Sequence, residues 1–184
     1  MRTKVPFKLQ KIIEEIDQRG QASMTRLTVL KKWFERPDRL RSFGIWMADR
    51  AVSIESGTTG DSHVRELFDA ARKLLADVDV LAPVLDHEST RSLHHRLWQF
   101  QHDYKSIPFE SCRIIKNWNL MLIEEGLGIY LGNQISPSDG YKLATYYCQH
   151  YDSTCGTSLN GPSRSKVEEI LHFVVNVELY EDGI

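Results

Sequence analysis

Four histidines lie close together in the middle of the chain, where side chains of this type could bind a metal ion. They are His87, His94, His95 and His102, with Asp86 and Glu88 beside the first of them. Two ligands on one helix face normally stand three or four positions apart. Here His95 and His102 are about 10 Å apart along a helix axis, too far to share one ion. The spacing therefore predicts a solvated polar stripe of His95, Gln99 and His102, and we expect no resident metal.

The stretch from Cys148 to Cys155 also contains metal-ligand residue types, but it lacks the CxxC spacing of a zinc site. If a helix continues through it, Cys148, Asp152 and Cys155 share one face, whereas His150 points elsewhere. Cys112 could supply a third thiolate only from a distant part of the chain. We expect neither a zinc site nor a Cys–His nucleophile here.

A glycine-rich run, Gly126 to Gly132, superficially resembles a phosphate-binding loop. Its third glycine is one position late for GxGxxG, no strand precedes it, and no Lys-Ser/Thr pair follows it. The simpler interpretation is that a helix ends at Gly126. A short extended segment would then turn at Gly132-Asn133.

Basic residues gather in the first 50 positions, and they are the broadest functional signal in the sequence. This region has twelve Lys/Arg against six Asp/Glu, for a net charge of +6, whereas the remaining 134 residues carry −8. Such a split is typical of a polyanion-binding face, or of two halves that attract each other. The candidate binding residues are Lys31, Lys32, Arg36, Arg39, Arg41, Trp46 and Arg50.

Two interpretations of this basic region remain open. A helix over 37–54 that follows two shorter helices has the outline of a helix-turn-helix unit, with Ser42 or Asp49 near base edges. One observation argues against DNA binding: most large side chains of this helix are apolar, which leaves few side chains to contact bases. Apolar residues beside its core stripe, including Trp33, Ile45 and Trp46, indicate a contact with the rest of the chain or with another chain. Contact with a protein partner is therefore the preferred hypothesis.

Composition places the chain among ordinary globular proteins. Hydrophobic residues make up 41% and charged residues 26% of its 184 positions, and four Trp, seven Tyr and seven Phe can fill a core. No apolar run reaches the roughly 18 residues of a membrane span. Three scattered cysteines and a start without a hydrophobic stretch predict a cytoplasmic location and no membrane contact.

Apolar residues recur with helical periodicity almost throughout. The pattern predicts helices over about 7–19, 23–34, 37–54, 62–75, 89–104, 111–125, 136–151 and 165–184. Residues 78–85 are ambiguous between a connector and a short strand, and 152–162 reads as an exposed loop. Alternating apolar residues in 172–180 resemble a strand, but the flanking pattern favours a helix.

The sequence thus predicts an all-α protein of about eight helices. Residues 1–56 would form a basic three-helix unit, packed on or linked to an acidic helical body over 61–184, or continuous with it. Gly57-Thr58-Thr59-Gly60 is the predicted boundary. We expect a non-enzymatic binding protein without cofactors that contacts a protein partner, or itself, through its basic helices; a DNA-binding regulator is the alternative.

Overall fold

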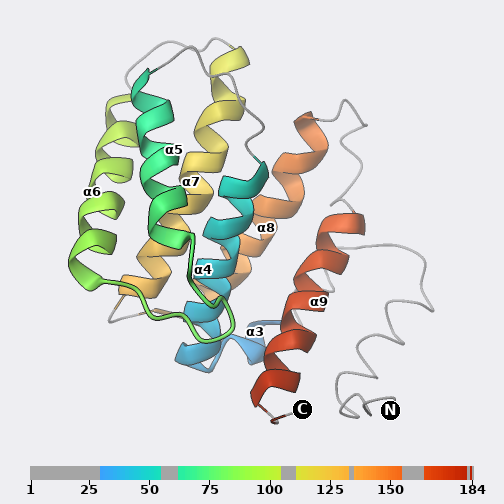
Figure 1. Ribbon diagram of the computed structural model, residues 1–184. Helices are drawn as coiled ribbons and strands as arrows, with labels where there is room; N and C mark the ends of the chain where they lie inside the picture. The colour runs from blue at the N-terminus through green and yellow to red at the C-terminus, as the bar shows by residue number, and fades with distance from the viewer. Residues whose placement is uncertain are drawn as a thin grey trace.

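The computed structural model describes residues 30–54, 62–104, 111–132, 135–154, 164–181 and 183, and α-helix is the only regular secondary structure in this part of the chain. Its seven helices carry the labels α3 to α9 (Figure 1). They are α3 (Leu30–Trp33), α4 (Pro37–Ile54), α5 (Ser62–Leu75), α6 (His87–Tyr104), α7 (Ser111–Leu131), α8 (Pro137–Thr154) and α9 (Arg164–Glu181). The predicted all-α class is confirmed.

Most predicted helices appear within a few residues of their expected bounds. The segment 172–180 is helical within α9, as predicted, and 76–86 is a connector without strand structure. Residues 152–154, predicted to begin a loop, continue α8 instead. The predicted helix over 7–19, most of the one over 23–34, the boundary at 57–60 and the rest of the loop lie outside the described residues. The two-part division of the chain therefore stays a prediction.

Helix α4 occupies the centre of the bundle, where it packs most extensively against α7 (Figure 1). Helices α5 and α6 lie on one side of this pair, and α8 and α9 lie on the other. Because α4 has neighbours on several sides, Leu40, Phe43, Ile45, Met47 and Ala51 are all essentially inaccessible to solvent. Buried apolar residues from all seven described helices, from Leu30 to Val177, form one hydrophobic core.

The prediction that a helix ends at Gly126 is wrong, because α7 continues through the glycine-rich run to Leu131. The reason lies in the contact between α7 and α4. A Cβ atom added to Gly44 would stand 2.6 Å from the carbonyl oxygen of Gly126, and one added to Gly126 would collide with the carbonyl oxygen of Gly44. The glycines therefore allow two helix backbones to touch, and they do not form a phosphate-binding loop.

Aromatic rings join α9 to the front of the bundle. Phe173 of α9 stacks on Trp46 of α4, with ring centroids 4.8 Å apart, and also approaches Phe43 and Trp33. Trp46 meets Tyr147 of α8 edge-on. The apolar surplus beside the core stripe of α4 is thus covered within the chain, which removes the need for a partner to cover Trp46.

Helix α8 begins as its sequence predicts. The backbone N–H of Ser136 donates to Asp139 Oδ2 at 2.9 Å, and Pro137 takes the first helical position. Pro137 has no N–H to leave unsatisfied, and Asp139 faces the positive end of the helix dipole. Further along α8, Tyr147 is fully buried in the core.

Replacing Gly126 by Ala tests the helix contact. We expect Gly126→Ala to lower the free energy of unfolding by about 2 kcal/mol or more, because the added methyl group meets backbone that cannot move aside. Gly128→Ala is the matched control in the same helix. Its Cβ would meet only the end of the His94 side chain, at 3.0 Å from Nε2. Because Ala favours a helix more than Gly does, its higher helix propensity should offset the cost of moving the His94 side chain. Equal losses for both variants in urea denaturation would contradict this account of α7.

Candidate functional site

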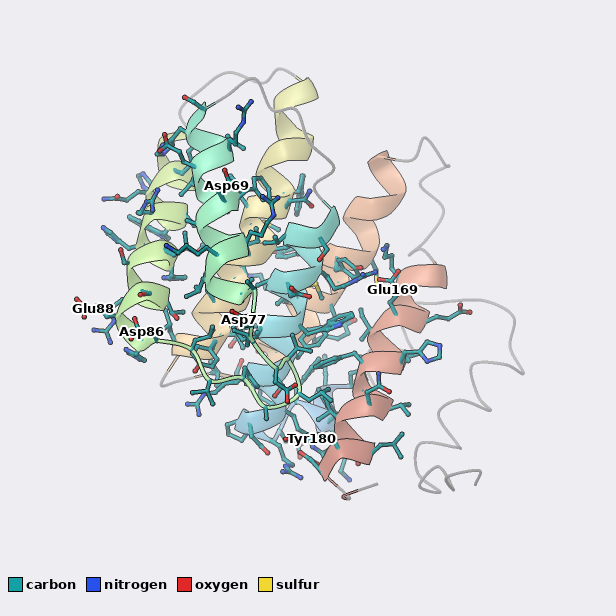
Figure 2. The ribbon with its side chains drawn as sticks, viewed as in Figure 1. Asp69, Asp77, Asp86, Glu88, Glu169 and Tyr180 are labelled. Atoms are coloured by element: carbon teal, nitrogen blue, oxygen red, sulfur yellow. The ribbon has the colours of Figure 1, made fainter. Side chains whose placement is uncertain are left out.

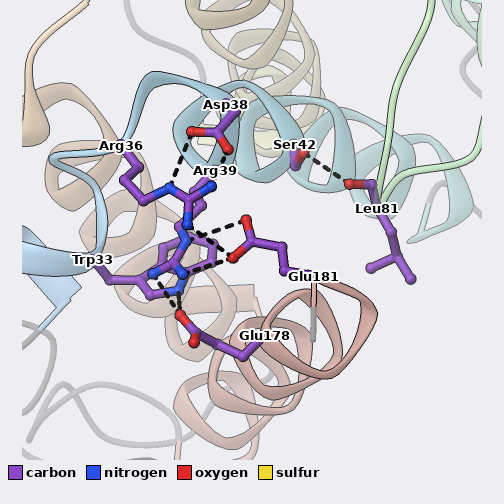
Figure 3. A network of polar contacts seen from close by, with 8 residues as sticks. All are labelled: Trp33, Arg36, Asp38, Arg39, Ser42, Leu81, Glu178 and Glu181. Carbon is purple, nitrogen blue, oxygen red and sulfur yellow. Dashed lines mark hydrogen bonds and ion pairs between the residues drawn. The ribbon is translucent and has the colours of Figure 1, made fainter. Parts of the chain in front are cut away.

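The predicted basic residues Arg36 and Arg39 contact the acidic end of α9 (Figure 3). Arg39 places Nη1 2.5 Å from Glu178 Oε1 and Nη2 2.7 Å from Glu181 Oε2. Arg36 Nη1 lies 3.1 Å from Glu181 Oε2, and Trp33 Nε1 donates to Glu178 Oε1 at 2.9 Å. These five residues, which we call the α9 clamp, connect α3 and α4 to the last turn of α9.

The α9 clamp is stronger than an ordinary surface ion pair. The side chain of Arg39 is only 14% exposed, and its guanidinium lies 5.5 Å from the centre of the Trp33 ring. Partial burial and a contact with two carboxylates both strengthen such a pair. Arg36 is exposed and also binds Asp38, and its hydrogen bond lowers the pKa of that carboxyl group. These arginines therefore serve intramolecular contacts.

A second polar group, the Glu169 cluster, lies between α4, α8 and α9. Glu169 Oε2 accepts from Tyr147 Oη at 2.6 Å and from Arg50 Nη2 at 2.9 Å, while Oε1 accepts from Lys166 Nζ at 3.0 Å. Burial alone would raise the pKa of Glu169, but these three hydrogen bonds outweigh it and lower the pKa. Burial and the bond to Glu169 raise the pKa of Tyr147, so its hydroxyl keeps its proton.

The predicted binding residues thus divide into two groups. Arg36, Arg39, Arg50 and Trp46 all contact α9 within the chain. The exposed cations Lys31, Lys32 and Arg41 face solvent, and Lys31 also lies 4.5 Å from the centre of the Tyr141 ring. Ser42, suggested as a base-contacting residue, is 5% exposed and donates to the carbonyl oxygen of Leu81 (Figure 3). Part of the basic region is therefore attracted to the acidic half of the same chain.

His94, His95 and His102 lie on a helix as predicted, His87 begins that helix two residues earlier than expected, and the four are not all on one face. His94 turns toward α7, with Nε2 3.5 Å from Glu124 Oε1, and burial lowers its pKa. His95 and His102 are exposed and stand on either side of Trp98. Within the described part of the chain, no three His, Cys, Asp or Glu side chains come together as metal ligands.

Cys148 is fully buried in the core on the inner side of α8. The positions of Cys155 and of the side chains of Cys112 and His150 lie outside the described residues. Because these side chains are outside the described part of the chain, the expectation concerning zinc or nucleophilic chemistry stays a prediction.

A groove that the sequence did not predict lies between the end of α5, the connector 76–86 and the start of α6. Its volume is about 720 Å³. The apolar lining consists of Ala70, Leu74, Val78, Val84, Leu85 and Leu93. The charged rim consists of Lys73, Asp77, Asp86, Glu88 and Arg96. Val84, at 87% exposed, is the most accessible large apolar side chain among the described residues.

Hydrogen bonds hold the connector that forms one wall of this groove. Ser42 Oγ of α4 donates to the carbonyl oxygen of Leu81 at 3.2 Å, and the backbone N–H of Leu85 donates to Tyr130 Oη of α7 at 3.0 Å. Asp86 begins α6 by accepting from the N–H of Ser89 at 2.8 Å. These contacts fix the course of the connector and therefore the shape of the groove wall. The sequence indicates this groove only indirectly, through the apolar segment 78–85 that interrupts the helical pattern.

Comparison of the chain with models of known protein families, with curated proteins and with solved structures finds no match. Across the residues described, no helix has both the length and the apolar character needed to cross a bilayer. Function must therefore be argued from the groove, the ion pairs and the exposed surfaces themselves.

Replacing Glu169 by Gln tests the Glu169 cluster. We expect Glu169→Gln to lower the free energy of unfolding by about 1 to 3 kcal/mol at neutral pH, because three donors lose a charged acceptor. The control His172→Ala, on the exposed side of α9, should change it by less than about 0.5 kcal/mol.

The pH dependence of that difference follows from the sign of the pKa shift. A carboxyl group whose pKa is lowered by folding contributes stability above its unfolded pKa, about 4.3 for Glu. That contribution disappears as the pH falls through the folded value. The stability difference between wild type and Glu169→Gln should therefore shrink in acid. A difference that stays constant from pH 7 to pH 3 in denaturant titrations would contradict the cluster geometry.

Replacing Tyr130 by Phe tests how the groove wall is held. We expect Tyr130→Phe to cost about 1 kcal/mol, because the buried N–H of Leu85 loses its acceptor. Amide hydrogen exchange at Leu85 should accelerate, whereas exchange at the core residue Leu122 should change only in proportion to global stability. Unchanged protection at Leu85 would show that the hydroxyl does not hold the connector.

Proposed function

We propose that the chain is a non-enzymatic protein-binding module that takes up a short apolar and basic segment of a partner protein in the groove between α5 and α6. The observation that carries this proposal is the combination of an apolar floor with a charged rim in a groove that is already formed. Interfaces between proteins share this anatomy of an apolar centre and a polar border. Pockets for small molecules are lined mainly by apolar groups with only a few polar ones. The five charged residues of this rim are therefore more typical of a protein-binding groove.

The charges on the rim select a basic segment. Asp77 follows the end of α5, and Asp86 and Glu88 stand at the start of α6, so carboxylates border the groove from both helices (Figure 2). Lys73 and Arg96 complete the rim and leave it with one negative charge in excess. A partner segment with a Lys or Arg beside apolar side chains would satisfy both the rim and the floor.

Rigidity of the connector supports the same conclusion. Because Ser42 and Tyr130 already hold residues 81–85, binding would require little additional ordering of the groove wall. Val84 would lose its exposure to water in the complex, which provides a hydrophobic contribution that the isolated chain does not use. These contributions suit a short segment with few anchoring side chains.

The residues predicted from sequence to contact a partner support this function less directly. Arg36, Arg39 and Arg50 are engaged with glutamates of α9, so using them for a partner would first cost those ion pairs. Lys31, Lys32 and Arg41 remain exposed. These three residues form the basic surface that stays available to a protein partner or, in the alternative hypothesis, to DNA. Two of them are changed in the control variant of the experiment below.

Selection from a phage-displayed library of random peptides of about twelve residues tests the proposal. The enriched peptides should carry a Lys or Arg next to two or more apolar residues. The double variant Val84→Glu, Asp77→Lys should weaken their binding at least about tenfold, a loss of about 1.4 kcal/mol. Both side chains are exposed, so thermal unfolding should be unchanged.

The double variant Lys32→Glu, Arg41→Glu is the matched control and should bind the same peptides as wild type does. Failure to enrich any peptide, or equal binding by the groove variant, would overturn the proposal. Mixed-sequence duplex DNA, titrated at low and high salt, serves as the second probe. Binding that weakens steeply with salt and is lost in the control variant would favour the DNA-binding alternative.

A further inference from the structure

The outward face of α6, away from the groove, carries a continuous stripe of exposed side chains. Arg91, His95, Trp98 and His102 follow one another at intervals of four, three and four residues, which places them on one side of the helix. The stripe extends over three turns, about 16 Å. None of these residues lines the groove, so the two surfaces are distinct. We call this set the α6 stripe.

The rings of the α6 stripe are arranged as a ladder. The centroid of the Trp98 ring lies 6.2 Å from that of His95, with the planes 13° apart, and 5.2 Å from that of His102. Trp98 is nevertheless 49% exposed. A large aromatic ring left half in water in the middle of a helix face is a typical anchor residue of protein interfaces.

Charge on the α6 stripe is of one sign. Arg91 is a cation, and the ring N–H groups of His95 and His102 can donate hydrogen bonds to a carboxylate. No carboxylate belongs to the stripe itself. The carboxylate of Glu124 on the neighbouring helix α7 turns to His94, which lies beside the stripe and faces inward. The surface thus combines one apolar anchor with three sites for negative charge.

We propose that the α6 stripe docks an acidic amphipathic helix of a partner protein. Carboxylates spaced by about one helical turn on that helix would pair with Arg91, His95 and His102, and an apolar pair of side chains would enclose the edge of Trp98. A partner helix lying alongside α6 has the same periodicity, so its side chains can contact all four residues of the α6 stripe at once. This inference goes beyond the proposed groove function and uses a different surface.

Other occupants fit this surface less well. Bases of single-stranded nucleic acid stack on open aromatic faces, but the imidazoles of His95 and His102 stand against Trp98 from both directions along the helix. Membrane-surface helices present many apolar side chains to the bilayer. Among described residues, Trp98 is the only large apolar side chain exposed on α6. A helix of a protein partner therefore fits best.

A designed peptide pair provides the test with the full chain. The probe is a helical peptide of about twenty residues with Glu at one-turn spacing beside a Leu stripe. Its matched partner has every Glu replaced by Lys. The acidic peptide should bind at low salt and weaken as salt increases, and the basic peptide should not bind. Trp98→Ala should reduce the affinity at least about tenfold, and His95→Ala, His102→Ala together should also reduce it.

Controls separate this surface from the groove. His172→Ala, at an exposed position of α9, and Val84→Glu in the groove should both bind the acidic peptide normally. Circular dichroism should show unchanged helicity for each variant, because the altered side chains are exposed. Absence of acidic-peptide binding, or binding unaffected by both stripe variants, would overturn the proposal. Tighter binding of phosphatidylserine vesicles or of a single-stranded oligonucleotide, lost on Trp98→Ala, would also overturn it.

Discussion

The direct contact of two helix backbones at Gly44 and Gly126 is the constraint on which the arrangement of the other helices depends. Because neither position carries a side chain, α4 and α7 approach closely enough for the residues on either side of the crossing to interdigitate. The central α4–α7 pair then offers two sides to the remaining helices. Helices α5 and α6 cover one side and α8 covers the other, and the groove and the α6 stripe both lie on the α5–α6 side.

Electrostatic attraction within the chain determines how α9 is placed. Glu169 near its start and Glu178 and Glu181 near its end meet Arg50, Arg39 and Arg36. Between these pairs Phe173 inserts among the aromatic rings of α4. Polar contacts at both ends fix the rotation and register of the helix, while the aromatic contacts in the middle bury apolar surface. The charge split between the two parts of the sequence thus has a structural use.

Periodicity was enough to predict the fold class and most helix bounds, because amphipathic stripes such as Val64, Leu67, Phe68, Ala71 and Leu75 are all buried as expected. It failed at Gly126, where glycine indicates close packing rather than a helix end. One sequence cannot distinguish these two uses of glycine, since the difference lies in the facing residue, Gly44, some eighty positions away.

The candidate surfaces were harder to predict than the helices. Basic residues could be found from the sequence, but their glutamate partners are separated from them by up to 145 positions. The groove could not be found because its floor combines α5, α6 and a connector whose course depends on Tyr130. The exposed residues of α6 were recognised as a polar stripe, although the ring ladder around Trp98 was not.

The aromatic contact between Phe173 and Trp46 also has a consequence for synthesis. A ribosome that releases α4 must add more than a hundred residues before Phe173 emerges. During that interval, which lasts about 6 to 24 s at ordinary elongation rates, Trp33, Phe43 and Trp46 lack their contact with Phe173. The nascent chain therefore presents an aromatic surface to chaperones, and a ribosome that stalls before α9 would leave that surface open.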